Sequence, residues 1–526
     1  MGSLSSPNSF QNDNVDLVVI GGGPTGLLSA VLARQQGLTV CVIEDDKDGP
    51  LKLGRADALN ARTQQYLEVV GVLKELRSKG IECNTSSTFS EGVFKSRQSQ
   101  WWTSLEHCLH KNFLMIGQPE VESALLGLFD HPVSYKEQVV SISEDDRGVS
   151  VNTSLGRIVH GKYAIAADGA RSMVRSSLGI SFTGTKPEMV WAVLDTFIDT
   201  DFPVCSEIIT FQLNGQSRVS WIPRERGMAR FYILLDGDIN QARAEQSIRD
   251  HMAPHRIDFV KTEWFSTFEV KERIASSFVS KEGSGRIILA GDAAHVHSVN
   301  GGQGLNTGVA DAFGLGWRIA MAVRAEKAAP EVASRLIKSY DTERRSVAQD
   351  VINVAARLVR DTMHTAKQYV ATIEKNAGYI TGMGVSYDGT GSALISESEH
   401  GIWKAGRRCP DLALLKPGSG QQTQSEPQRL YSIPRYGQFL IVQVGTSQVG
   451  DDQHQSQGAA LYLTIRTPNH DNSGQACGLS IDERQEFRAD DVSESDACVV
   501  VVRPDMYIGY VGNETGAEEY IAGFLA

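Results

Sequence analysis

The sequence predicts an α/β fold, and three short stretches that lie far apart in the chain support this prediction. Each stretch joins a strand to a glycine turn or to an acidic residue, and the three lie at 20–26, 166–169 and 289–292. Strands that end in this way are typical of a Rossmann-like domain, which binds a nucleotide cofactor where its strands end. We therefore expect such a domain to be assembled from separated segments of this chain.

The first stretch has the glycine spacing of a dinucleotide-binding turn. Gly21, Gly23 and Gly26 lie between an apolar strand at 17–20 and a helix that begins at Thr25. Gly21 allows a sharp turn, Gly23 lets the backbone approach a pyrophosphate, and Gly26 lets the helix and the strand pack closely. Three glycines alone are weak evidence, but the flanking strand and helix supply the context that this motif requires.

A second apolar strand at 38–43 ends in Glu44, at the distance from the turn that ribose recognition needs. A carboxylate at this point can accept hydrogen bonds from both ribose hydroxyls of an adenosine. Asp45 and Asp46 follow, and their charges would repel a 2′-phosphate. The turn is therefore expected to bind FAD or NAD.

The third stretch distinguishes FAD from NAD. An apolar strand ends in a Gly-Asp pair at 291–292, and the segment 300–306 then opens a long helix. Asp292 can hold a polyol hydroxyl. The amides of Gly304, Leu305 and Asn306 present a helix N-terminus to the negative charge of a reduced isoalloxazine. A flexible loop is the alternative for the glycine-rich run, and the adjoining Gly-Asp pair favours FAD.

On these residues the chain resembles class A flavoprotein monooxygenases, the group of aromatic hydroxylases that includes phenol and para-hydroxybenzoate hydroxylases. The resemblance extends over most of the first 400 residues and includes an Asp-Gly element at 168–175 and a Gly-Asp element at 291–295. It implies that Asp168 and Arg175 contact FAD and NADPH, and that Asp292 binds the ribityl chain. A guanidinium suits phosphate oxygens, although a solvated helix start is the alternative for Arg175.

The same resemblance assigns Arg55 and Gln118 to the flavin. Arg55 opens a segment that runs beside the isoalloxazine in relatives, and Gln118 lies where relatives place a glutamine or an arginine near the diphosphate or ribityl portion. No second glycine turn of this kind follows a strand. The resemblance therefore implies that NADPH is a transient co-substrate, used together with O2.

Asp57, Arg224 and Tyr232 match the catalytic pattern of phenol hydroxylases, and we expect them to be catalytic. In the family a flavin C4a-hydroperoxide hydroxylates a phenolate, so a base must take the hydroxyl proton. Asp57 is the expected base, Tyr232 can hold the phenolic oxygen and relay its proton, and Arg224 can stabilise the anion or the neighbouring carboxylate. Each residue also has a non-catalytic alternative. Asp57 could cap a helix, Arg224 could be a charged residue of a turn, and Tyr232 could be a half-buried strand residue.

Alternating apolar and polar residues between 190 and 235 predict a β-sheet with one buried face, which we interpret as a substrate domain that shields the flavin from water. A helical pattern follows at 336–375. The expected division is a flexible tail at 1–14, a Rossmann-like FAD-binding domain at 15–184 and 281–376, a mixed β-sheet substrate domain at 185–280 with part near 84–115, a linker at 377–400 and a C-terminal domain at 401–526.

The C-terminal domain is expected to be thioredoxin-like. Strands predicted at 439–444, 459–465 and 497–503 have the order found in the domain attached to phenol hydroxylases. The region contains no CxxC, so we expect a role in packing or dimer stabilisation rather than in disulfide exchange. The polar stretch 416–428 is expected to be an exposed loop.

Composition excludes several classes of partner. The 526 residues are 41% hydrophobic, which is enough for several cores, and the net charge of −12 without a basic run argues against nucleic acid or an anionic membrane. No apolar run is long enough to span a membrane and the N-terminus lacks a signal-like segment, so we expect a cytoplasmic protein. The scattered cysteines and the pair His295 and His297 predict no metal site.

Together these patterns predict an NADPH- and O2-dependent flavoprotein monooxygenase of secondary metabolism that hydroxylates a phenolic or polycyclic, polyketide-type aromatic molecule and is compatible with a homodimer. Two alternatives remain open, namely Baeyer-Villiger oxygen insertion and FAD binding without catalysis. The segment 297–300 departs from the family, whose members carry one or two prolines after the histidine. Since proline fixes φ, this departure leaves the cavity size and the regiochemistry open.

Overall fold

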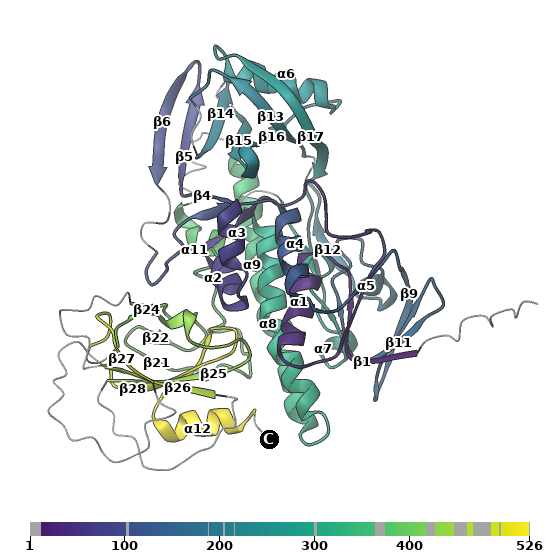
Figure 1. Ribbon diagram of the computed structural model, residues 1–526, viewed down its shortest axis with the longest axis vertical. Coiled ribbons are helices and arrows are strands. Elements are labelled where there is room, and N and C mark those ends of the chain that lie inside the picture. The colour runs from purple at the N-terminus through teal and green to yellow at the C-terminus, as the bar shows by residue number, and fades with distance from the viewer. Residues whose placement is uncertain are drawn as a thin grey trace, which may run out of the picture.

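The computed structural model describes residues 12–524, except for 101, 103–104, 188, 204–205, 215, 299–301, 363–373, 417–426, 446–459, 467–484 and 494–495. Two long helices that pack on each other, α8 (Gln303–Ala325) and α9 (Pro330–Thr362), run through its centre (Figure 1). A nucleotide-binding sheet, a second sheet and a C-terminal domain surround these helices (Figure 1). The α/β fold predicted from the sequence is confirmed.

The nucleotide-binding sheet has the order β8-β2-β1-β11-β10-β9, and β19 also pairs with β11. Its strands are β1 (Asn12–Ile20), β2 (Val40–Glu44), β8 (Val133–Tyr135), β9 (Val139–Asp145), β10 (Gly148–Thr153), β11 (Ile158–Ala166) and β19 (Ile287–Leu289). Strands β1, β2, β11 and β19 are parallel, so their carboxyl ends lie at one edge. Their carboxyl-terminal halves are buried and, apart from Glu44, apolar, and α1 (Pro24–Gln35) packs on β1, β2 and β11 and in turn on α8.

The second sheet, which we call the substrate sheet, has the order β17-β13-β16-β15-β14-β5-β6. Its strands are β5 (Thr85–Ser90), β6 (Val93–Gln100), β13 (Val190–Thr200), β14 (Ile208–Leu213), β15 (Gln216–Pro223), β16 (Ala229–Leu234) and β17 (Ile257–Glu269). It is mixed because β5 joins β14 in parallel. One face packs on α6 (Gln241–Met252) through an apolar cluster that includes Phe211 and Phe231. The opposite face is turned towards the segment that begins at Arg55, which we call the flavin-side segment.

Shorter elements connect these two sheets. They are α2 (Ala61–Val70), α3 (Leu73–Lys79), α4 (Gln118–Leu128), α5 (Met173–Ser177), α7 (Ser280–Gly283), β3 (Ala58–Leu59), β4 (Ile81–Cys83), β7 (Phe113–Met115), β12 (Phe182–Thr185), β18 (Glu272–Ala275) and β20 (His295–Val296). Strand β18 pairs with β12 and β20 rather than with the substrate sheet. None of the helices in the described ranges is long and apolar enough to cross a membrane.

The C-terminal domain contains a sheet with the order β27-β26-β25-β28-β29 and the helix α12 (Glu514–Ala522). The strands are β25 (Phe439–Val444), β26 (Ala460–Arg466), β27 (Gln485–Arg488), β28 (Cys498–Val502) and β29 (Ile508–Gly512). The thioredoxin-like assignment remains a prediction, and most of the expected loop at 416–428 lies outside the described residues. The segment 377–400, which begins with α11 (Ala377–Ile380), packs Tyr387 and Leu394 into the interior.

Buried ion pairs attach the C-terminal domain to α8 and α9. Glu343 of α9 accepts hydrogen bonds from Arg503 at 2.7 and 2.9 Å, and Asp505 pairs with Arg503 at 2.6 Å and with Arg318 of α8 at 3.1 Å. Burial opposes the ionisation of both carboxyl groups. Nevertheless, Arg318 and Arg503 lower the pKa of Glu343, and they lower that of Asp505 to about 2. The network is therefore fully ionised at neutral pH.

We predict that Glu343→Ala destabilises the protein by about 3–5 kcal/mol, because it removes one of the two carboxylates that neutralise the buried guanidinium groups of Arg318 and Arg503. Glu399→Ala is the matched control, since it removes an exposed carboxylate that pairs with Lys404 at 2.9 Å and should cost at most about 1 kcal/mol. Urea unfolding of the holoenzyme measures both changes. Equal losses in the two variants would contradict a structural role for the buried network.

Candidate functional site

The glycine turn between β1 and α1 has the geometry that nucleotide binding requires. Gly21 adopts a positive φ of 108°, and a Cβ atom there would lie 2.2 Å from the carbonyl oxygen of Ala167. A Cβ at Gly26 would lie 1.9 Å from the Gly21 oxygen, so only glycine allows α1 to pack this closely. In contrast, nothing lies within 4 Å of the position that a Cβ would take at Gly23. The backbone is thus accessible at the point where a diphosphate was predicted.

Glu44, the predicted ribose ligand, lies at the end of β2 beside this turn. Its side chain is buried and accepts a hydrogen bond from the amide of Gly22. Lys47 donates to the Gly22 carbonyl at 3.1 Å and pairs with Glu122 at 3.0 Å, and both bonds fix the loop that carries the carboxylate. The structure therefore brings Glu44 to the glycine turn.

The two other predicted motifs follow strands that adjoin β1. Asp168 comes after β11 and Asp292 after β19, so both acids lie at the same sheet edge as Gly21. One oxygen of Asp168 accepts from the Val174 amide at 3.1 Å, whereas Oδ1 is buried and has no partner among the described residues. Burial raises the pKa of Asp168, so a ligand that donates a hydrogen bond to Oδ1 would stabilise this group.

Arg175 joins the two acidic motifs without pairing to a carboxylate in the described ranges. Its guanidinium donates to the carbonyl oxygens of Ala293 at 2.7 Å and Ala170 at 3.1 Å, and it lies 3.8 Å from the ring centroid of Phe182. Burial lowers its pKa. A phosphate group would supply the anion that this buried cation lacks.

The N-terminus of α8 meets the segment that was predicted to run beside the flavin. Asn306 accepts a hydrogen bond from the Asn60 amide at 2.9 Å and donates to the Ala58 carbonyl at 3.0 Å. Gly304 is exposed, Leu305 is half-buried, and a Cβ at Gly304 would meet nothing within 4 Å. Residues 299–301, which include part of the predicted glycine-rich segment and of its departure from the family, lie outside the described residues.

Arg55 is the first residue of this segment, and Gln118 of α4 contacts the segment. Arg55 is exposed and adopts a positive φ of 65°, a conformation that is uncommon for a residue other than glycine. Its carbonyl oxygen accepts a hydrogen bond from Arg230. Gln118 accepts from the Ala56 amide at 3.3 Å and donates to Glu122 at 2.9 Å, so it joins the segment to α4.

Two of the three predicted catalytic residues are in contact. The hydroxyl of Tyr232, on β16, donates to Oδ2 of Asp57 at 3.2 Å. The alternative of Asp57 as a helix cap is wrong, because Asn60 caps α2 through a bond from the Thr63 amide at 2.9 Å. Burial and the charge of Asp57 raise the pKa of Tyr232, against the opposing effect of Arg230. The tyrosine is therefore protonated and acts as the donor.

Arg224, the third predicted residue, does not bond to either of them directly. Its guanidinium forms a double hydrogen bond with Glu225 at 2.9 and 2.7 Å and approaches Asp195 at 3.4 Å. Glu225 in turn accepts from the Gly117 amide at 3.1 Å. Arg224 thus pairs with Glu225 and Asp195, and the structure does not bring it into contact with Asp57 or Tyr232.

Sequence reasoning did not assign the cation that lies between these groups. Arg230 forms a double hydrogen bond with Asp195 of β13, both contacts at 2.6 Å, and also lies 3.5 Å from Asp57 and 3.5 Å from the Tyr232 hydroxyl. Two signals could have identified these residues. Arg230 and Tyr232 share a strand face by their spacing of two, and Asp195 directly follows the apolar run 190–194 of its strand.

The residues at this edge fit FAD. Three motifs meet at adjacent strand ends, and the backbone of the glycine turn is accessible. Among the described residues, Oδ1 of Asp168 has no hydrogen-bond partner and Arg175 has no carboxylate partner. Asp292 presents an exposed carboxylate at the same edge. In the described part of the chain no group of three or more metal-ligating side chains gathers.

Comparison with known proteins agrees with this geometry. A family model described as FAD binding domain matches residues 14–355. A phenol 2-monooxygenase of Aspergillus fumigatus is 28% identical over 421 residues, which are 74% of this chain and 68% of the relative. A rifampicin monooxygenase of Streptomyces venezuelae is 26% identical over 525 residues, which are 95% of this chain and 96% of the relative.

A solved structure has the same fold over nearly its whole length. The OxyS anhydrotetracycline hydroxylase from Streptomyces rimosus is 23% identical, with a TM-score of 0.71 that covers 97% of this chain and 99% of the other. The chain spans 61% of the length of two further fungal FAD-dependent monooxygenases, from Aspergillus thermomutatus and Aspergillus terreus.

We predict that Gly26→Ala lowers FAD affinity at least about tenfold, a change that requires only ~1.4 kcal/mol, because the new methyl group would force α1 away from the glycine turn. Gly127→Ala is the matched control. Nothing lies within 4 Å of its Cβ position, and alanine should stabilise α4 by up to about 1 kcal/mol. The ratio of flavin to protein absorbance after dialysis measures FAD retention. Full retention by Gly26→Ala would disprove this role for the turn.

Proposed function

The chain belongs to the FAD-binding domain family of flavoprotein monooxygenases, and from this membership we propose that it hydroxylates a phenolic or polycyclic aromatic molecule with NADPH as electron donor and O2 as oxidant. The membership confirms the resemblance that the sequence motifs predicted. The observation that supports the proposed activity is the 3.2 Å contact between Tyr232 of the substrate sheet and Asp57 of the flavin-side segment.

The distribution of charge makes Asp57 the best proton acceptor of this cluster. The Asp195 carboxylate accepts two hydrogen bonds from the Arg230 guanidinium, both at 2.6 Å, and the Glu225 carboxylate accepts two from Arg224. Asp57 is left with the longer contact to Arg230, at 3.5 Å. Its carboxylate is therefore the least compensated negative charge of the cluster, and it can receive a proton.

Tyr232 can pass that proton from substrate to carboxylate. Its hydroxyl donates to Asp57, so the lone pairs of the same oxygen can accept the hydroxyl proton of a bound phenol. As the phenol proton moves to Tyr232, the tyrosine proton moves to Asp57, and the ring becomes a phenolate. A phenolate is the stronger nucleophile towards the oxygen that FAD, when bound and reduced, activates.

The substrate sheet also supplies the water exclusion that oxygen transfer needs. Tyr232 lies opposite Val193 of β13 and Ser220 of β15 in the register of the sheet, so these side chains share its face. Trp264 of β17 lies near the same cluster, with its ring centroid 5.3 Å from the Arg230 guanidinium. We infer that this face covers the aromatic substrate from the side opposite to the nucleotide-binding sheet.

We predict that Asp57→Asn lowers hydroxylation of an un-ionised phenol by about 10²–10⁴-fold at neutral pH, which is the usual contribution of a general base. A nitrophenol that is already ionised should recover most of the lost rate, because its proton has gone before it binds. Product formation under NADPH and O2 measures both rates. Asp236→Asn, an exposed change of the same chemical kind in the substrate domain, is the matched control and should behave as wild type.

The same assay separates the alternatives. An Asp57→Asn enzyme with full activity would remove the base and favour Baeyer-Villiger insertion, in which deprotonation of a phenol is dispensable. A wild-type protein that binds FAD, yet oxidises NADPH no faster with any aromatic compound of a phenol and polyketide panel, would be a flavin-binding protein without this catalysis. Substrate-stimulated NADPH oxidation with one oxygen atom added to the product supports the proposal.

We predict that Tyr232→Phe lowers the hydroxylation rate by about 10–100-fold and that this ratio is constant between pH ~6 and ~9. The raised pKa keeps Tyr232 protonated throughout this interval. The raised pKa also affects stability. Below the ordinary tyrosine pKa, Tyr232 is protonated in both the folded and the unfolded state. Above that pKa the unfolded state loses the proton first, so the free energy of unfolding falls as the pH rises. A ratio that changes tenfold per pH unit would contradict a protonated relay.

A further inference from the structure

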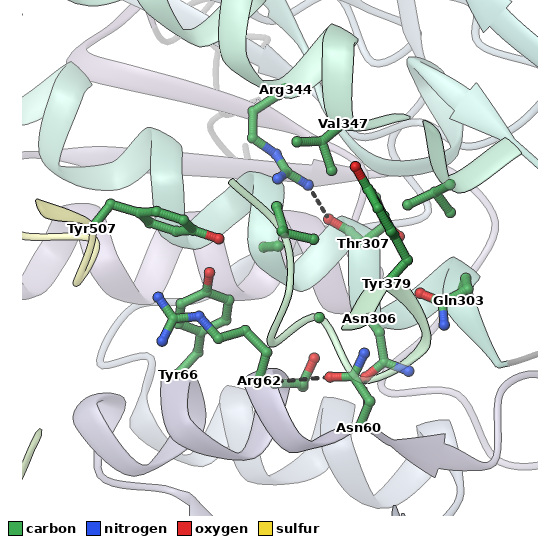
Figure 2. Close-up of a pocket in the computed structure, with 15 residues that line it drawn as sticks. Asn60, Arg62, Tyr66, Gln303, Asn306, Thr307, Arg344, Val347, Tyr379 and Tyr507 are labelled. Atoms are coloured by element: carbon green, nitrogen blue, oxygen red, sulfur yellow. Dashed lines mark hydrogen bonds between the residues drawn. The ribbon is translucent and has the colours of Figure 1, made fainter. Parts of the chain in front are cut away.

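A small cavity lies between α2, α8, α9 and the C-terminal domain (Figure 2). Its volume is about 30 Å³, and Arg62, Tyr66, Arg344 and Tyr507 are among the residues that line it. One water molecule needs about 10–15 Å³ by the same measure, so the cavity holds one or two small molecules or one small ion. The proposed monooxygenase reaction uses none of these four residues.

Arg62 brings an uncompensated positive charge to this cavity. Its buried guanidinium donates to the side-chain oxygen of Gln65 at 2.9 Å, to the Tyr431 hydroxyl at 2.7 Å and to the carbonyl oxygens of Asp505 and Met506 at 3.4 Å. Within the described ranges it forms no ion pair, and its Nε has no hydrogen-bond partner. A buried cation without an anion is strongly unfavourable.

Two tyrosines add hydrogen-bond donors beside this cation. The guanidinium carbon of Arg62 lies 4.5 Å from the ring centroid of Tyr66 and 5.0 Å from that of Tyr507. Both side chains are at most 2% exposed, and neither hydroxyl bonds to a residue that the structure describes. Figure 2 shows both rings close to Arg62. Both tyrosines line the cavity, so their hydroxyls can donate hydrogen bonds to a molecule inside it.

The polar groups around the cavity provide few acceptors. Arg344 lies opposite Arg62, and its counterion Asp311, at 2.8 Å, is shared with His295 at 2.7 Å (Figure 2). The side-chain oxygens of Asn60 and Asn306 accept from backbone amides. The lining thus has donors and positive charge in excess, which favours an anion over a neutral molecule.

We propose that this cavity is a binding site for one small monovalent anion of the size of chloride, which serves as the counterion of Arg62 and accepts hydrogen bonds from Tyr66 and Tyr507. Arg62 and Tyr66 belong to α2, whereas Tyr507 belongs to the C-terminal domain. The bound anion therefore links this domain to the nucleotide-binding domain. The site does not depend on the proposed monooxygenase activity.

Thermal unfolding of the holoenzyme tests the site. The protein is prepared in sodium gluconate, and chloride replaces gluconate at constant ionic strength. We expect a saturable rise in the unfolding temperature. At a chloride concentration of ten dissociation constants, binding to the native state multiplies the ratio of folded to unfolded protein about elevenfold. An unfolding temperature that is the same in both salts would overturn the proposal.

Variants connect the effect to the cavity. Tyr66→Phe combined with Tyr507→Phe removes two donors and keeps the rings, so it should weaken chloride binding by at least about tenfold. Tyr163→Phe is the matched control, because Tyr163 is a buried tyrosine in β11, outside the cavity, and its hydroxyl has no hydrogen bond to the described residues. An unchanged chloride response in the double variant would overturn the assignment of the site.

Bromide locates the anion without any substitution. Crystals of the wild-type holoenzyme grown in sodium bromide should show an anomalous scattering peak between Arg62, Tyr66 and Tyr507. Density for water alone at this position, with no anomalous signal, would overturn the proposal even if chloride stabilises the protein elsewhere.

Discussion

The desolvation of positive charge is the constraint on which this structure depends. The buried arginines that pair with buried carboxylates are Arg224, Arg230, Arg318, Arg344 and Arg503. Arg62 and Arg175 are also buried, but neither pairs with a carboxylate in the described part of the chain. Because an unpaired buried charge is unfavourable, we infer that each of these two arginines is completed by a bound anion. Arg175 lies between the Asp-Gly and Gly-Asp motifs, and Arg62 lines the small cavity.

The paired arginines also dock the domains on each other. Arg230 belongs to the substrate sheet but donates to the carbonyl oxygen of Arg55 in the flavin-side segment, and Glu225 accepts from the amide of Gly117. Arg503 of the C-terminal domain reaches Glu343 of α9 in the same manner. Charge pairs are directional, whereas apolar contacts are not. The ion pairs therefore define how each domain is oriented relative to the edge of the nucleotide-binding sheet where FAD is expected. A misplacement of even about 1 Å is expected to impair catalysis.

Local patterns predicted much of this fold. The strands β2 and β25 and the helix α1 follow from apolar runs and turn glycines, which act between residues close in sequence. The pairings that assemble the site act over long distances. Spacing places Arg230 and Tyr232 on one strand face, but it does not show that this face meets Asp57, 175 positions away. The missing counterion of Arg62 was equally invisible, because its carbonyl partners lie 443 and 444 positions away.

The division of the proposed catalytic cluster between two domains has a chemical consequence. Asp57 lies on the segment that meets α8, so its place is tied to the flavin side, whereas Tyr232 and Asp195 lie on the substrate sheet. The sheet can therefore change the side chains that face the substrate while the proton acceptor stays where it is. Such a change must keep the ion pair of Asp195 and Arg230. Without Asp195, the Arg230 guanidinium would be free to pair with Asp57, and a paired carboxylate is a weaker base. We therefore expect that other side chains on this face of the substrate sheet can change to accept new substrates, whereas Asp195 and Arg230 cannot.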